Sequence, residues 1–433
     1  MIDIYKINNI YNLEDDKIDS IMKIINDTYT EIESDILLRE QVENLDRSKL
    51  LSYAIFLGEI YNLLNENNRC DEIIFVIVKE IKKRIETGNI YDANIYNGLG
   101  HASIAMNIIS KNTGNYKNFN DQVEHFLIEG MISKLNVIFN VKRCKAELYD
   151  IIMGVSGWML YLIEFSNLSK SERLITSIQS YILELIEDKD INGHNISGWY
   201  VKSEDLPFSS DREMFSSGYF NFGISHGIAG ILLALSISYN KGIKINNHKD
   251  AILKLVAEFD KTAREINNLT YWPGILTLEE YMNNKSITEA QRNSWCYGNV
   301  GILCSLQHAA KALDRIDLLN LVKDQVNKIA ILRREEHLLN STVICHGYSG
   351  LILLFEWYNK IEPSDNLINS IKNYAELLIH SYDLNPKYAF FGIDHTGKHK
   401  EEFAVLDGPM GSILTLITLI KNDSNFQKNF AFI

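Results

Sequence analysis

Two cysteines and a histidine are the residues of this sequence best suited to bind a metal ion. Cys296, Cys345 and the adjacent His346 offer two thiols and one imidazole. Thiolates and imidazole nitrogens are ligands that Zn²⁺ favours, in tetrahedral geometry. A structural zinc site usually has four protein ligands, whereas three ligands and one open position are typical of a catalytic site. If these three side chains converge, the sequence predicts one catalytic zinc ion per chain.

The charge of such a site indicates its chemistry. Two thiolates and one neutral imidazole balance the charge of Zn²⁺, so a fourth, anionic ligand makes the site net negative. The metal keeps a bound thiol deprotonated, although the pKa of a free cysteine is about 8.5. The electron-rich surroundings keep that thiolate nucleophilic. We therefore expect activation of a substrate thiol rather than of water.

An internal repeat predicts how these residues come together. A G-x-x-G step occurs five times, and a degenerate copy, Gly98-Leu-Gly-His101, precedes the complete steps. The first glycines of the six copies are 56, 73, 71, 49 and 61 residues apart, which leaves room for two helices and a loop in each interval. The complete steps begin at Gly154, Gly227, Gly298, Gly347 and Gly408.

Each step leads into an apolar segment, such as ILLALSI after Gly230 and LILLF after Gly350. These segments are apolar nearly all round, which predicts buried helices. The segments between them, such as 171–187, have apolar residues at helical spacing on one face and predict outer helices. Six buried helices alternating with six amphipathic ones predict an all-α fold, an (α/α)6 toroid. Residues 91–433 would carry the repeats, and 1–90 would form N-terminal helices that join the toroid.

The glycines of the steps are expected where a loop enters each inner helix and where two backbones approach closely. Three long polar or aromatic stretches, 188–222, 268–295 and 383–406, each precede a step. We therefore expect long loops on one rim of the toroid, where loops usually build the functional site. An open helical solenoid is the alternative fold, although solenoid repeats are usually shorter and more regular.

Equivalent positions in the repeats carry the polar residues. Cys296 and Cys345 lie two positions before the first glycine of their steps, and the residues one position before are His226, Tyr297, His346 and Asp407. If the repeats are structurally equivalent, these side chains all face one central mouth, and Cys296, Cys345 and His346 converge. The alternative is that each cysteine is a buried residue at the start of a helix, with no metal.

Composition excludes several classes of protein. The net charge of −13 argues against nucleic acid as a partner, because phosphate binding needs a basic face. No apolar run is long enough for a membrane span, and the acidic N-terminal segment is not a signal peptide. The five cysteines, an odd number, do not suggest a disulfide framework. We therefore expect a cytoplasmic protein.

Three motifs carry a resemblance to a known family. Ser225-His-Gly-Ile-Ala-Gly230, Trp295-Cys-Tyr-Gly298 and Cys345-His-Gly347, in this order, resemble the lanthionine synthetase C-like proteins, and most closely the stand-alone lantibiotic cyclases. The resemblance extends from about residue 90 to 420. It implies an α-toroid that binds one zinc ion. It also implies addition of peptide Cys thiols to dehydroalanine or dehydrobutyrine, which forms lanthionine or methyllanthionine rings.

The resemblance implies roles for individual residues. Cys296, Cys345 and His346 match the zinc ligands of the family, His226 its conserved histidine and Asp150 its aspartate, while Arg292 and Tyr297 flank the first cysteine as they do there. The sequence departs from the family in Gly298-Asn-Val-Gly301, where proline often precedes the last glycine, and in His101, which replaces a glycine. Neither departure touches a ligand.

We expect His226 to be the acid that protonates the product, since imidazole titrates near neutral pH. Asp150 would orient His226 or accept the thiol proton, and its alternative role is that of a helix N-cap. Arg292 would stabilise an enolate, unless it is a surface residue. Tyr297 would pack beside the zinc ion. For His226 the alternative is a helix-capping or core histidine.

The resemblance also predicts partners. The substrate would be a dehydrated lanthipeptide precursor, and a dehydratase and an export transporter are further expected partners, which would hold the chain at the inner face of a membrane. Two other functions stay open. A zinc-containing scaffold of the same family would bind a peptide or a small thiol without turnover. A zinc toroid that prenylates a thiol would need a basic diphosphate pocket, and no Arg/Lys cluster lies beside the ligands in the sequence.

Overall fold

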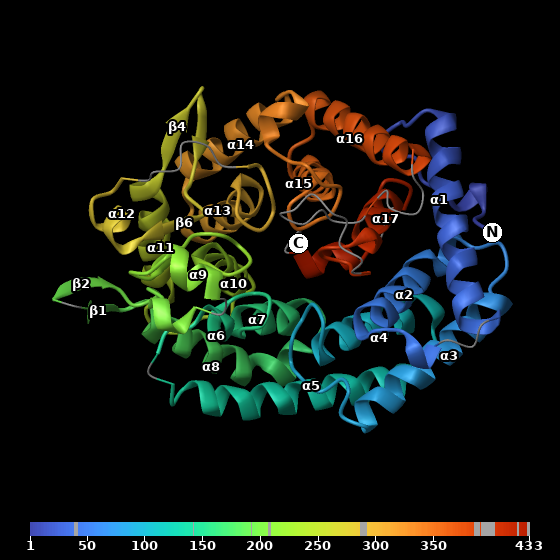
Figure 1. Cartoon of the computed structure of the whole chain (residues 1–433), viewed down its shortest axis with the longest axis horizontal. Helices are drawn as coiled ribbons and strands as arrows, with labels where there is room; N and C mark the ends of the chain where they lie inside the picture. The colour runs from blue at the N-terminus through green and yellow to red at the C-terminus, as the bar shows by residue number, and fades with distance from the viewer. Residues whose placement is uncertain are drawn as a thin grey trace. The chain divides into compact units, whose positions relative to one another are not determined.

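The computed structural model describes residues 1–38, 42–141, 143–191, 193–206, 209–285, 292–384, 390, 403–421 and 424–430. Helices dominate these ranges (Figure 1). The α-helices are α1 (Asp15–Glu33), α2 (Arg47–Ile60), α3 (Asn68–Glu86), α4 (Leu99–Thr113), α5 (Lys117–Ile138), α6 (Ala146–Tyr149), α7 (Val155–Glu164), α8 (Leu168–Ile186), α9 (Ser209–Met214), α10 (Ile228–Asn240), α11 (His248–Thr262), α12 (Leu278–Met282), α13 (Asn299–Leu313), α14 (Ile316–Ala330), α15 (Tyr348–Ile361), α16 (Asp365–Leu384) and α17 (Pro409–Thr418). The prediction of an all-α fold is confirmed.

The strands of the described residues form three small antiparallel pairs in the loops between helices. The pairs are β1 (Asp188–Ile191) with β2 (His194–Ser197), β3 (Tyr219–Asn221) with β6 (Ile275–Thr277), and β4 (Arg264–Ile266) with β5 (Leu269–Tyr271). They lie within or next to two of the long loops predicted from the sequence, 188–222 and 268–295. Most of the third, 383–406, lies outside the described residues.

The chain divides into two compact units. The first consists of residues 1–130 and 340–433, and the second of residues 131–339. Helix α5 contributes to both. The division of the chain into segments 1–90 and 91–433 stays a prediction.

In the second unit, three buried helices pack side by side. Helix α10 contacts α7 and α13 (Figure 1), and every residue of α10 from Ile228 to Ser238 is buried. Helices α8, α11 and α14 are buried on one face only, which packs on these inner helices. The predicted alternation of buried and amphipathic helices is therefore present in this unit.

The first unit combines segments from both parts of the chain. Helix α2 packs against α4 and α17, α15 packs against α16 and α17, and α1 packs against α16 and α17. Helices α4, α15 and α17 follow glycine steps and are almost wholly buried, as predicted. Helix α2 is also buried, from Leu50 to Ile60, although no glycine step precedes it. The described helices thus include a seventh buried helix beside the six that the steps predict.

The glycine steps fix the entry into the inner helices. The first glycine of each of the six copies is the N-cap residue of its helix. A Cβ atom on Gly298 would lie 2.1 Å from the carbonyl oxygen of Arg292, and one on Gly301 would lie 2.3 Å from that of Trp295. Only glycine permits such contacts, which confirms the predicted close approach of backbones.

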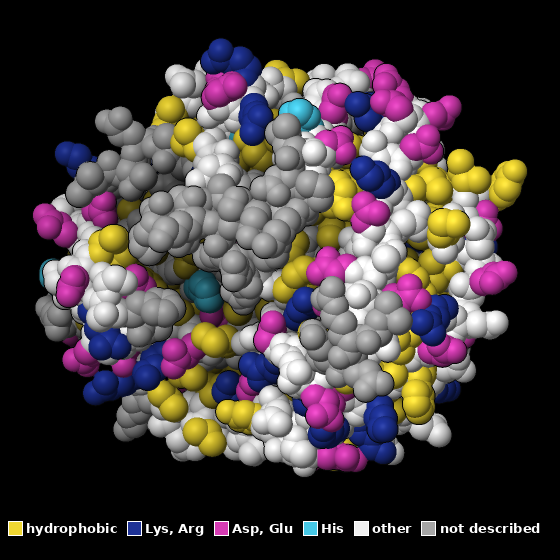
Figure 2. Space-filling model, turned by 45° about the vertical axis from the view of Figure 1, so that its right-hand side comes forward, with side chains coloured by type: hydrophobic (Ala, Val, Ile, Leu, Met, Phe, Trp, Pro, Cys, Tyr) yellow, Lys and Arg dark blue, Asp and Glu magenta, His cyan; other side chains and the backbone are white. Residues whose placement is uncertain are grey.

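Two further features concern the surface. Figure 2 shows acidic and basic side chains interspersed over the face in view, so the acidic excess of the chain, 56 residues against 43, does not gather in one area there. Among the described residues, none of the helices is both long and apolar enough to span a membrane.

A buried ion pair holds the C-terminal segment against α2 in the first unit. Glu59 is fully buried, and its Oε2 lies 2.6 Å from Nζ of Lys421. Its Oε1 accepts hydrogen bonds from the backbone N–H groups of Asn425 (2.8 Å) and Phe426 (3.0 Å). These partners of the carboxylate all come from the segment that follows α17.

We expect Lys421→Met to destabilise the first unit, because it leaves the Glu59 carboxylate buried without its cation. The free energy of unfolding should fall by about 3–5 kcal/mol, measured by urea denaturation followed by circular dichroism. Lys79→Met, at an exposed position of α3, is the control. Adding Glu59→Gln to Lys421→Met should recover part of the loss. Equal stability of the Lys421 and Lys79 variants would contradict the role of the pair.

Candidate functional site

Backbone hydrogen bonds hold three turns of the second unit side by side. The turns precede α7, α10 and α13. The N–H of Ile151 donates to the carbonyl of Ser225 (3.3 Å), and the N–H of Ile224 donates to the carbonyl of Cys296 (3.0 Å). The residues just before the inner helices are therefore neighbours, as the repeat predicts.

His226 and Asp150 form a hydrogen-bonded pair across two of these turns. Nδ1 of His226 lies 2.6 Å from Oδ2 of Asp150, whose side chain is fully buried. The other carboxylate oxygen, Oδ1, accepts from the N–H groups of Met153 (2.7 Å) and Gly154 (2.8 Å), at the start of α7. Asp150 is therefore placed to orient His226, one of the roles predicted from the sequence. It is not the helix N-cap that was the alternative, because the N-cap of α7 is Gly154, although its side chain holds the turn that leads into this helix.

The contact with Asp150 changes the pKa of the His226 imidazole. Burial by itself lowers the pKa of His226, but the hydrogen bond and the charge of Asp150 raise it more, and Cys296 raises it further. The net result is a pKa above the ordinary value. The imidazolium form therefore persists to higher pH than in a free histidine, and with Nδ1 held by Asp150, Nε2 is the nitrogen able to donate a proton.

Arg292 and Tyr297 flank Cys296 in the third turn. Nη2 of Arg292 donates to Sγ of Cys296 at 3.7 Å, a contact that favours the thiolate form of the cysteine. The ring of Tyr297 lies 6.3 Å from that of His226, centroid to centroid. The structure therefore places Arg292 and Tyr297, together with His226 and Asp150, around the turn that carries Cys296.

Sequence reasoning missed Asn221. This residue is fully buried, its Nδ2 donates to the hydroxyl of Tyr297 at 3.4 Å, and its Oδ1 accepts from the N–H of Gly223 at 3.0 Å. A signal was present, because Asn221 lies six positions before Gly227, as Arg292 lies six before Gly298. In both repeats, the residue six positions before the first glycine therefore belongs to the turn that leads into the inner helix.

Cys345 and His346 occupy the corresponding turn of the first unit, before α15. The N–H of Cys345 donates to the carbonyl of Leu406 (3.0 Å), which places this turn beside the one before α17. Nδ1 of His346 lies 3.3 Å from Oδ1 of Asp407. The structure thus places Cys345 and His346 together in the first unit and Cys296 in the second. Their convergence on one ion stays a prediction.

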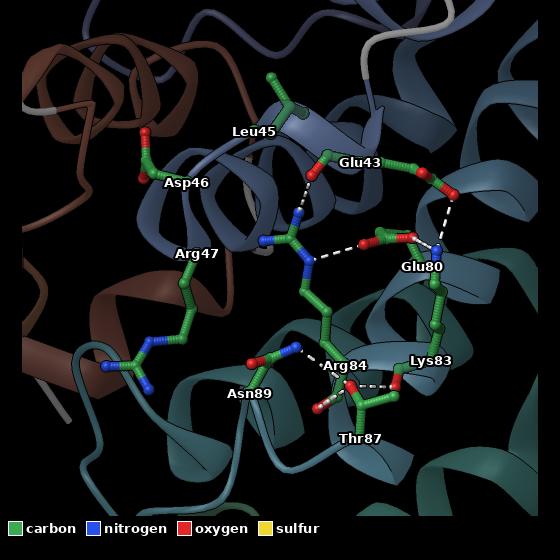
Figure 3. Close-up of a pocket in the computed structure, with 9 residues that line it drawn as sticks. All are labelled: Glu43, Leu45, Asp46, Arg47, Glu80, Lys83, Arg84, Thr87 and Asn89. Carbon is green, nitrogen blue, oxygen red and sulfur yellow. Dashed lines mark hydrogen bonds and ion pairs between the residues drawn. The ribbon is translucent and has the colours of Figure 1, made fainter.

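A separate cavity of about 420 Å³ lies in the first unit (Figure 3). None of the predicted site residues lines it. Its acidic and basic groups are matched: Arg84 Nε pairs with Glu80 at 2.7 Å, and Lys83 pairs with Glu43 at 2.6 Å. The Lys83–Glu43 pair joins the 3₁₀ turn Val42–Asn44 to α3, whereas Arg84 and Glu80 pair within α3. It is lined by Glu43, Leu45, Asp46, Arg47, Glu80, Lys83, Arg84, Thr87 and Asn89.

Comparison with known proteins places the chain in a family. Residues 50–431 match the family model described as lanthionine synthetase C-like protein. The nisin biosynthesis protein NisC of Lactococcus lactis subsp. lactis is 24% identical over 355 residues, which are 79% of this chain and 82% of that protein. A solved structure of nisin cyclase matches with a TM-score of 0.79 and 23% identity, over 94% of this chain and 98% of that one.

The likeness to the nisin cyclase structure shows the fold. It confirms the predicted helical toroid in place of the open solenoid. The three motifs that carried the resemblance, around His226, Cys296 and Cys345, all lie within the matched residues. Since the family model covers most of the sequence, the chain belongs to the lanthionine synthetase C-like family.

Proposed function

We propose that the chain is a lanthionine synthetase that closes thioether rings in a lanthipeptide precursor. It adds Cys thiols of the peptide to dehydroalanine or dehydrobutyrine residues of the same chain. The observation that carries this proposal is the His226–Asp150 pair beside the turn of Cys296, since it provides a proton donor next to a predicted metal ligand. The names of the relatives, a nisin biosynthesis protein and a nisin cyclase, support the same substrate class.

We also propose that Cys296, Cys345 and His346 hold one Zn²⁺ ion. The donor set fits this metal, because two thiols and an imidazole are of the types that could hold one ion and leave one position open. The contact of Arg292 with Sγ of Cys296 supports the thiolate form that a metal requires. When bound, the ion would supply a low pKa for the substrate thiol.

The reaction forms one C–S bond and one C–H bond, and it breaks the S–H bond and the π bond of the alkene. The thiol gives up its proton to solvent, from which His226 is reprotonated after each turnover. The sulfur attacks the β-carbon of the dehydro residue, the π bond breaks, and the negative charge passes to the neighbouring carbonyl as an enolate. His226 then delivers a proton from Nε2 to the α-carbon, and the Asp150 carboxylate stabilises the imidazolium before transfer. Arg292 and Tyr297 stabilise the enolate oxygen and hold the peptide in place. No atoms are lost, so the mass of the peptide is unchanged.

The chemistry of the substrate implies further partners. Dehydro residues arise from Ser and Thr by loss of water, so a dehydratase must act first, and the product needs an export transporter. We propose that the chain works with both at the inner face of the membrane, in the cytoplasm. All five cysteines are free thiols, which is typical of proteins in a reducing compartment.

Incubating the chain with a dehydrated precursor peptide should remove the alkylatable thiols of the peptide without changing its mass. The measurement is the mass spectrum before and after treatment with iodoacetamide. His226→Ala should slow this loss by about 10²–10⁴-fold, because it lacks the proton donor. Peptide that binds and keeps every thiol would instead support a scaffold without turnover, and a mass gain would indicate transfer of another group.

Cys345→Ala should lose the bound zinc, because only two of the three proposed ligands remain. Metal analysis should fall from about one zinc ion per chain to near zero. Cys304→Ala is the matched control, since Cys304 is buried within α13 and is not a proposed ligand. A fully loaded Cys345 variant would refute the ligand assignment.

Asp150→Asn should move the alkaline limb of the rate profile to lower pH. The raised pKa of His226 depends on the Asp150 carboxylate, so a neutral amide lowers that pKa and the imidazolium is lost sooner as pH rises. At high pH the rate of ring closure should fall by up to about 10²–10⁴-fold, the usual contribution of a general acid. The control, Asp188→Asn on exposed β1, should keep the original profile. If the unaltered chain, Asp150→Asn and Asp188→Asn all show the same dependence of rate on pH, Asp150 does not raise the pKa of His226.

A further inference from the structure

We propose that Asn221 is a positioning residue for Tyr297, so that the phenolic hydrogen of Tyr297 is donated to the enolate oxygen of the substrate. The proposal rests on the ring-closing function proposed above, in which Tyr297 stabilises the enolate. It starts from one hydrogen bond within the second unit: Nδ2 of Asn221 donates to the hydroxyl oxygen of Tyr297 at 3.4 Å. Asn221 is fully buried, whereas Tyr297 is half-buried and follows Cys296 in the chain.

The backbone determines which way the Asn221 amide faces. Its Oδ1 accepts a hydrogen bond from the N–H of Gly223 at 3.0 Å, so the amide nitrogen is the atom that faces Tyr297. An amide nitrogen has no lone pair to offer and can only donate. The Tyr297 hydroxyl therefore accepts from Asn221 and has to donate its own hydrogen to a different acceptor.

A second tyrosine supports the donor role of the Asn221 amide. Burial raises the pKa of Tyr219 to about 12, and a hydrogen bond with the Asn221 side chain opposes this shift. A hydrogen bond lowers the pKa of a phenol when it is donated to the phenolic oxygen, because it stabilises the phenolate. Asn221 thus acts as a donor toward the hydroxyls of both Tyr219 and Tyr297.

Close packing keeps both side chains in place. A Cβ atom on Gly227 would lie 2.5 Å from Oδ1 of Asn221. A Cβ atom on Gly223 would lie 2.8 Å from Cδ1 of Tyr297. Only glycine leaves room at these two positions for the amide and for the aromatic ring. The hydrogen bond between Asn221 and Tyr297 is therefore built into the packing of the two turns.

The reaction supplies the acceptor for the phenolic hydrogen. As the sulfur adds to the alkene, negative charge gathers on the carbonyl oxygen, and a hydrogen-bond donor at that oxygen stabilises the transition state more than the bound substrate. A hydroxyl that accepts a hydrogen bond also becomes a stronger donor, because the two bonds polarise each other. The rings of Tyr297 and His226 are 6.3 Å apart, so the two side chains can contact the oxygen and the α-carbon of one enolate.

The test compares the kinetics of ring closure for full-length Asn221→Asp and Asn221→Leu, each with and without Tyr297→Phe. Ionised aspartate keeps the acceptor for Gly223 but offers Tyr297 only acceptors, so it draws the phenolic hydrogen away from the substrate. Leucine has a similar size and removes the amide. With a dehydrated precursor peptide at pH 8, kcat should fall by up to about 10²–10³-fold, the usual loss for one enolate donor, while KM changes little.

The decisive result is the coupling between the two residues. In the Tyr297→Phe background, neither change at Asn221 should slow ring closure further, because the hydroxyl through which Asn221 acts is absent. Gln179→Glu is the matched control. Gln179 is also fully buried in the second unit, and its amide donates to the carbonyl of Ile243 at 2.9 Å. This variant should lose stability but keep the kcat of the unaltered chain.

Equal kcat for the unaltered chain and the Asn221 variants would overturn the proposal, and so would an unchanged kcat for Tyr297→Phe. Losses at Asn221 that are just as large in the Tyr297→Phe background would also overturn it, because they would indicate packing. The same holds if neither Asn221 variant folds while Gln179→Glu does, since Asn221 is then required for the turn itself. If the unaltered chain leaves the peptide thiols unreacted, the proposed function is refuted, which separates the two failures.

Discussion

The close approach of backbones at the glycine steps is the constraint on which the rest of the structure depends. At Gly298 and Gly301 the neighbouring carbonyl oxygens occupy the space that a side chain would fill. The turn can then pack tightly on its own helix and on the next turn, with hydrogen bonds such as that from Ile224 to Cys296. The residues one and two positions before each first glycine are consequently held on rigid backbone. A reactive side chain there needs no flexible loop to support it.

The same residues stabilise the turns and orient the reactive side chains. One oxygen of Asp150 holds the start of α7 and the other holds His226, so the orientation of the imidazole depends on the geometry of the helix start. Cys296 also has both a structural and a chemical contact. Its carbonyl accepts a hydrogen bond from the N–H of Ile224 in the preceding turn, while its sulfur accepts one from Arg292. A change in the packing of these turns therefore alters the electrostatics of the site directly.

The sequence predicted these turns because glycine spacing is a local signal. Each first glycine begins a helix, and the residues before it are readily identified. Helix α2 was missed as a buried helix because it begins at the capping residue Asp46 rather than at a glycine. Asn221 was missed because its role depends on where Tyr297 lies, which is a long-range contact. The contact of His346 with Asp407 could not be predicted from the sequence for the same reason, and the convergence of Cys296 with Cys345 still depends on the repeat.

The composition of the first unit has a consequence for biosynthesis. Residues 131–339 are continuous, so every segment of the second unit is available once this stretch has left the ribosome. The first unit has to wait for residues 340–433, because α17 packs on α2 and the buried Glu59 carboxylate needs Lys421. Throughout that interval the apolar face of α2 lacks its cover, and a nascent chain stalled before α17 would be a natural client for chaperones.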